Sequence, residues 1–145
     1  MSKTQTIDVN TLIVQLEAIR SEISQLRSFI SQLLLQRDGI VKAKSSIDAI
    51  GNSSEENIIF PLDPGYMAMT IAKPLDKNHF IIYLGADIYA KLETNEAMKI
   101  LTEKESELNN AINDVSQRLS QLEKLQDQYE SVLQQISEQA QQQKV

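Results

Sequence analysis

The sequence predicts a mainly α protein with a small β part, in which a long antiparallel coiled-coil hairpin is interrupted by two β-hairpins. Two observations predict this class. In both halves of the chain, apolar residues recur by alternating steps of three and four, which is the spacing of a coiled-coil seam. Between these halves the period changes to short apolar runs separated by turn residues, and all three prolines, Pro61, Pro64 and Pro74, lie there.

The first seam predicts an N-terminal coiled-coil helix over residues 5–50. Its positions are Val9, Leu12, Leu16, Ile19, Ile23, Leu26, Ile30, Leu33, Arg37, Ile40, Lys44 and Ile47. Mostly polar residues separate them, so the helix needs a partner for its apolar stripe. Gly51 and Asn52 supply a stop signal.

The second seam predicts a C-terminal coiled-coil helix over residues 93–143. Its positions are Met98, Leu101, Glu105, Leu108, Ile112, Val115, Leu119, Leu122, Gln126, Tyr129, Leu133, Ile136 and Ala140. No glycine or proline follows Gly85. Thr94 or Asn95 is the expected N-cap, with Glu96 in the first turn.

The polar residues within the two seams suggest how the helices align. If Arg37 faces Glu105, the antiparallel pairing also brings Leu26 near Val115 and most of the seam closes apolar on apolar. A charged pair at this level fixes the alignment more than it adds stability, because desolvation offsets the attraction.

The segment 51–92 predicts two β-hairpins that act as an oligomerisation block. The first has strands over residues 57–62 and 66–72 around the turn Asp63-Pro64-Gly65, and the second turns at Gly85-Ala86. Isolated two-stranded hairpins are marginal in water, so apolar hairpins predict pairing with hairpins of other subunits. The residues expected at this interface are Ile58, Phe60, Met67, Met69, Ile71, Phe80, Ile82, Leu84 and Ile88.

Composition excludes several function classes. The chain of 145 residues has no cysteine, which excludes thiolate catalysis, and a formal net charge of −6, which argues against nucleic acid and anionic membranes as partners. The single histidine, His79, has no second histidine or cysteine with which to bind a metal. We therefore expect no enzyme activity, cofactor or metal site. Without an apolar leader or a membrane-length segment, the expected location is the cytoplasm.

The order helix, two hairpins, helix, with "PLDPGYMAMTIAKP" and "YLGADIYAKLETNEA" in the hairpins, resembles the alpha-type subunits of the prefoldin family over nearly the whole chain. The resemblance implies a hexamer of two alpha-type and four beta-type subunits, in which the hairpins join an oligomeric β-barrel. It also implies an ATP-independent chaperone that holds nonnative proteins at the coiled-coil tips and delivers them to a group II chaperonin.

An antiparallel helix pair places both ends of the chain together, where off-seam aliphatic residues provide more apolar surface than two helices can cover. This predicts a client-binding tip formed by Ile7, Val9, Leu12, Ile13, Val14, Tyr129, Val132, Leu133 and Ile136. The same aliphatic residues are also compatible with the second stripe of a bundled helix. The alternative function is a structural coiled-coil protein that forms prefoldin-like filaments or a scaffold.

Overall fold

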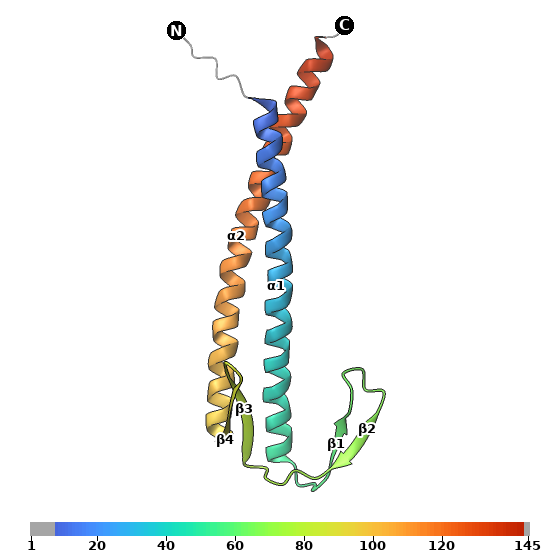
Figure 1. Ribbon diagram of the computed structural model, residues 1–145, viewed down its shortest axis with the longest axis vertical. Coiled ribbons are helices and arrows are strands. Elements are labelled where there is room, and N and C mark those ends of the chain that lie inside the picture. The colour runs from blue at the N-terminus through green and yellow to red at the C-terminus, as the bar shows by residue number, and fades with distance from the viewer. Residues whose placement is uncertain (1–7, 144–145) are drawn as a thin grey trace. The chain divides into compact units, whose positions relative to one another are not determined.

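A computed structural model describes residues 8–143 of the chain (Figure 1). The order of elements is α1 (Val9–Asn52), β1 (Ile58–Pro61), β2 (Met69–Ala72), β3 (His79–Gly85), β4 (Ile88–Glu93) and α2 (Thr94–Gln142). The predicted class, two long helices with two small β-hairpins between them, is confirmed. The chain divides into two units, which we call the terminal unit (8–35 with 110–143) and the central unit (36–109).

The terminal unit is an antiparallel pair of helical segments. One cluster of its core consists of Ile19 and Ile23 from α1 and Leu122 from α2, all less than 10% exposed. Further apolar residues pack against this core: Leu26, Leu119, Leu125 and Tyr129. These are seam positions with the exception of Leu125, so apolar spacing decides which face of each helix is buried.

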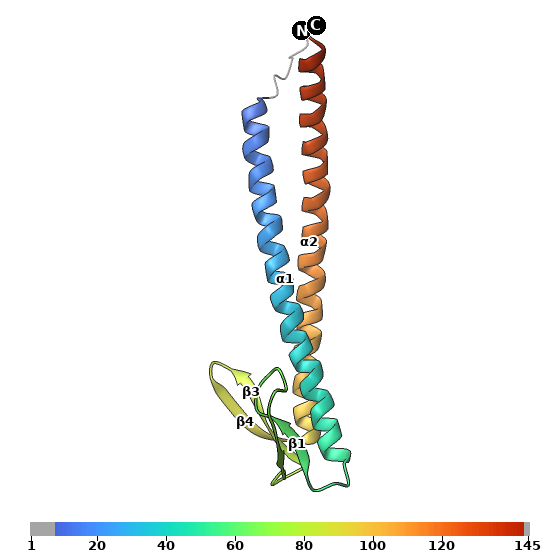
Figure 2. The same cartoon turned by 90° about the vertical axis from the view of Figure 1, so that its right-hand side faces the viewer.

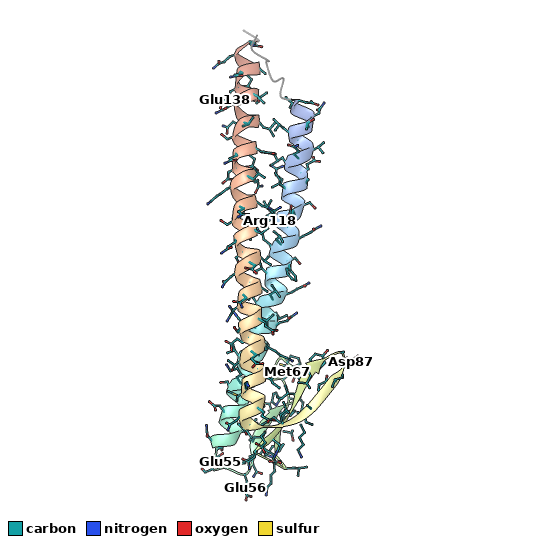
Figure 3. All side chains as sticks on the ribbon, turned by 90° about the vertical axis from the view of Figure 1, so that its left-hand side faces the viewer. Glu55, Glu56, Met67, Asp87, Arg118 and Glu138 are labelled. Atoms are coloured by element: carbon teal, nitrogen blue, oxygen red, sulfur yellow. The ribbon has the colours of Figure 1, made fainter. Side chains whose placement is uncertain are left out.

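Ion pairs flank the core of the terminal unit. Arg20 bonds Glu130 at 2.9 Å and Arg27 bonds Glu123 at 3.1 Å, so that residue numbers rise along α1 as they fall along α2. Arg118, labelled in Figure 3, bonds Glu22 at 3.1 Å. In all three pairs the charged groups are about half exposed, so they fix alignment more than they contribute to stability.

The central unit has its own core, to which both helices and the second hairpin contribute. The buried residues are Ile47 of α1, Ile82 of β3, and Ala97 and Leu101 of α2. Phe80 packs against them from β3. The second hairpin is therefore anchored by one face to the helices.

The two hairpins form two separate antiparallel sheets of two strands each. Figure 2 shows β3 and β4 side by side in the second sheet. In the first, Ile59 pairs with Ile71 and Pro61 with Met69. In the second, the register shifts between Tyr83 and Gly85, as in a β-bulge.

The first hairpin has shorter strands than the alternation of residues predicts. The Leu62 amide donates to the Ala68 carbonyl beyond the last strand pair, and Tyr66 has a φ of 58°, a left-handed conformation that extended strands do not adopt. The turn expected at Asp63-Pro64-Gly65 is present, because the Tyr66 amide donates to the Asp63 carbonyl at 3.2 Å, and it lies within a longer loop over residues 62–68.

The predicted contact between Arg37 and Glu105 is wrong. The Arg37 Nη1 donates to Asn109 Oδ1 at 3.0 Å, and Glu105 instead accepts a hydrogen bond from Lys44 Nζ at 2.9 Å. Asn109 lies four residues beyond Glu105, so this contact is displaced by about one helical turn from the prediction.

Candidate interaction surfaces

The second hairpin has one covered face and one uncovered face. Ile82 is only 6% exposed in the central core, and Phe80, on the same face, is half-buried against it. Ile81 and Tyr83 alternate with them along β3 and are exposed, as is Tyr89 of β4. The uncovered face is therefore apolar and available to another chain.

Two tyrosine rings on this uncovered face pack against one another across the two strands. Tyr83 and Tyr89 are cross-strand partners whose ring centroids lie 5.1 Å apart at 54°. The Lys104 ammonium of α2 lies 5.4 Å from the centre of the Tyr83 ring and donates a hydrogen bond to the Tyr83 carbonyl. A cation over a tyrosine ring attracts it electrostatically, so Lys104 ties this end of the hairpin to α2.

The first hairpin is largely uncovered on both faces. The cross-strand partners Ile59 and Ile71 are 70% and 74% exposed on one face, and Phe60 is 52% exposed on the other. Met67, labelled in Figure 3, lies in the loop and is 89% exposed. Since a two-stranded sheet with no cover on either face is marginal in water, this hairpin is the part of the chain that most requires a partner.

Asp63 organises the loop of this hairpin. Its side chain accepts hydrogen bonds from the Gly65 and Ala68 amides, both at 2.9 Å. Backbone amides, led by that of Ala68, hold the pKa of Asp63 below its ordinary value because they stabilise the carboxylate. The loop is thus shaped by one charged side chain.

The structure separates the predicted interface residues by exposure. Six are exposed: Phe60, Met67, Met69, Ile71, Leu84 and Ile88. Ile58 and Phe80 are half-buried, and Ile82 lies in the chain's own core. Exposed apolar side chains that the prediction did not include are Ile59, Leu62, Tyr66, Leu75, Ile81, Tyr83 and Tyr89. Strand alternation places Ile81 and Ile82 on opposite faces of β3, and packing against the helices decides that the face of Ile82 is the buried one.

The start of α1 exposes the off-seam aliphatic residues of the predicted tip. Ile13 is 41% and Val14 is 65% exposed, and Val9 is also exposed. Five others are half-buried: Leu12, Tyr129, Val132, Leu133 and Ile136. Ile7 lies outside the described residues. The first turn is ordered by Asp8, whose side chain accepts hydrogen bonds from the Asn10 amide at 3.1 Å and the Thr11 hydroxyl at 3.0 Å.

A groove of about 230 Å³ lies in the central unit. It is lined by Val41, Lys44, Ser45, Asp48, Met98 and Glu105. Lys44 and Glu105 neutralise one another there at 2.9 Å, so two of the three charged side chains of the groove are engaged in a structural contact. Over the described range 8–143, neither helix carries an apolar window of the length and hydropathy that bilayer crossing requires.

Comparison with known proteins gives a consistent result. The family model described as prefoldin subunit matches residues 12–142. The prefoldin alpha subunit of Aeropyrum pernix is 33% identical over 123 residues, which cover 85% of this chain and 81% of that protein. The prefoldin alpha subunit of Saccharolobus solfataricus is 25% identical over 134 residues, which cover 92% of this chain and 90% of that protein.

A solved structure shows the same fold. The cryo-EM structure of filamentous PFD from Methanocaldococcus jannaschii superimposes with a TM-score of 0.64, covering 89% of this chain and 98% of that one. The two sequences are 19% identical, so the likeness concerns the arrangement of helices and hairpins.

Proposed function

We propose that this chain, which belongs to the prefoldin family of chaperones as an alpha-type subunit, is a component of an ATP-independent holdase. In this proposal it binds nonnative proteins through the tips of its coiled coil and delivers them to a group II chaperonin. We further propose that it works in the cytoplasm within a hexamer of two alpha-type and four beta-type subunits.

The observation that carries the proposal is the presence of uncovered apolar surface of two kinds. Hairpin residues such as Ile59, Ile71 and Ile81 are exposed on flat strands, which suits pairing with another strand pair. Ile13 and Val14 are exposed near the start of a helix, where no strand edge is offered for pairing. The first kind fits a permanent partner and the second fits weak, adaptable binding of many clients.

Several weak tips within one particle also explain how binding needs no nucleotide. Each tip contributes little affinity, but a nonnative chain that contacts several tips dissociates only when all of them release it. The gain in avidity comes from effective concentration and uses no external energy.

The experiment measures suppression of thermal aggregation of a model client without nucleotide. The full chain with a beta-type partner is compared with the double variant Ile13→Ser, Val14→Ser and with the control Leu35→Ser, which removes an aliphatic side chain of similar exposure from another part of α1. We expect the double variant to lose most of the protection and the control to retain it. Equal protection by the double variant and the wild type would remove these residues from client binding.

The alternative function is a structural coiled-coil protein that forms prefoldin-like filaments or a scaffold. The solved relative from Methanocaldococcus jannaschii is described as filamentous. Electron microscopy of the isolated chain and of its mixture with a beta-type subunit separates the two functions, because a hexameric chaperone gives discrete particles and a filament protein gives continuous fibres.

A further inference from the structure

The link between α1 and the first hairpin is held by a lysine from a distant part of the sequence. Lys77 Nζ donates a hydrogen bond to the Ser53 carbonyl at 3.1 Å and another to the Glu55 carbonyl. Ser53 and Glu55 lie in the link that joins the end of α1, at Asn52, to the start of β1. Lys77 lies in the connector between the two hairpins, so its side chain ties together the two segments that flank the first hairpin.

The electrostatics of the α1 terminus favour this contact. The last turn of α1 contains no basic residue, although the carbonyl groups at a helix C-terminus attract positive charge. Lys77 supplies that charge from outside the helix. Its backbone is also close, since a Cβ added to Gly51 would lie 3.9 Å from the Lys77 carbonyl oxygen.

The turn that carries Lys77 is itself held on both sides. Asp76 Oδ1 accepts a hydrogen bond from the Asn78 amide at 2.8 Å, and Asp76 Oδ2 lies 2.8 Å from His79 Nδ1. The Asn78 carbonyl accepts hydrogen bonds from the Thr94 amide at 3.0 Å and the Thr94 hydroxyl at 3.2 Å. Residues 76–79 therefore connect the first turn of α2 to the link that follows α1.

We propose that Lys77 is a positioning residue whose ammonium group clamps the link 53–55 and thereby fixes the direction in which the first hairpin leaves α1. The first hairpin has little cover on either face, so its direction depends on the two segments at its root that Lys77 joins. Preorganising the hairpin lowers the entropy lost when another chain pairs with it.

The test uses distance measurements between spin labels on the full chain. The absence of native cysteine allows clean labelling at Ser46→Cys on α1 and Thr70→Cys on β2, both exposed positions in the central unit. Lys77→Met removes the donor, and Lys77→Arg retains one. Lys73→Met is the matched control, because Lys73 lies at the root of the same hairpin and its ammonium group lies 3.5 Å from the exposed Glu56 carboxylate.

We expect Lys77→Met to broaden the distance distribution about twofold, and we expect Lys77→Arg and Lys73→Met to leave it near the wild-type width. A second measurement is amide hydrogen exchange at Glu55 and Thr94, which we expect Lys77→Met to accelerate about tenfold or more, because both charge-assisted hydrogen bonds of the ammonium group are lost. Circular dichroism establishes that the helices are intact. An unchanged distribution in Lys77→Met, or equal broadening in Lys73→Met, would overturn the proposal, whether or not the chain acts as a chaperone.

Discussion

Individual polar side chains decide how the two helices align, and this is the level at which the sequence was least informative. A heptad seam closes apolar on apolar in several alignments, because shifting one helix by a turn brings another aliphatic residue opposite each position. Opposite charge and the apolar closure of the rest of the seam together predict that Arg37 faces Glu105. In the structure Arg37 donates to the Asn109 side-chain oxygen and Glu105 accepts from Lys44. These pairings depend on the reach of each side chain, which a seam pattern does not contain.

The pair Lys44–Glu105 is the alignment contact with the most burial, since both side chains are only about a quarter exposed. We expect Glu105→Ala to lower the free energy of unfolding by about 1–2 kcal/mol, because Lys44 is left half-buried without its acceptor. The exchanged variant Lys44→Glu, Glu105→Lys should recover most of the loss. Chemical denaturation of the single, double and wild-type chains measures this, and an exchanged variant no more stable than the single one would contradict a direct pairing.

Asp63 gives the loop of the first hairpin a dependence on pH. Its pKa is lowered from the ordinary 3.8, so the carboxylate stabilises the loop above about pH 4, and this contribution is lost as the pH falls through the lowered pKa. We expect the Gly65 and Ala68 amide signals in NMR spectra to move together as the pH is lowered in that range. Asp63→Asn retains an acceptor oxygen but does not titrate, so the same amides should show no such transition.

At the scale of elements, the sequence predicted the helices well and the strands less well. Helix bounds follow from a period repeated many times and from stop signals. The last residue of α1 is Asn52, the second residue of the predicted stop signal Gly51-Asn52. The strands are short, so a single unexpected conformation changes their limits. The left-handed φ of Tyr66 is such a case, because tyrosine seldom adopts it and the sequence carries no signal for it.

The turn of the second hairpin departs from the usual residue preference. Ala86 and Asp87 both have positive φ, 49° and 59°, at positions where Asn-Gly is favoured. We expect Ala86→Asn, Asp87→Gly to raise the free energy of unfolding of this hairpin by about 1 kcal/mol, because asparagine and glycine adopt left-handed conformations at lower cost. Hydrogen exchange of the β3 and β4 amides measures the change. Faster exchange in the variant would show that the native turn is not strained.

At the scale of the whole molecule, folding and assembly are linked. The central core covers one face of the second hairpin, whereas residues 8–143 leave the other face and both faces of the first hairpin largely exposed. Strand alternation predicted that these hairpins need partners, but it could not separate residues that serve the chain's own core, such as Ile82, from those left for another subunit, such as Ile81. That division depends on which face packs against the helices, and only the three-dimensional arrangement supplies it.

This linkage predicts that the stability of the hairpins depends on protein concentration. Partners that bind only the folded hairpins stabilise them by mass action, so the midpoint of hairpin unfolding should rise with the concentration of chain and beta-type subunit. We expect the variant Ile59→Thr, Ile71→Thr to reduce this dependence, because threonine keeps a β-branched side chain but removes apolar contact area. Leu35→Gln, which removes an equally exposed aliphatic side chain from α1, should leave the dependence intact. Thermal scans over about a hundredfold range of protein concentration measure the effect. If the unfolding midpoint of the wild type did not depend on concentration, the hairpins would be stable without partners. That result would contradict the expectation for uncovered two-stranded sheets.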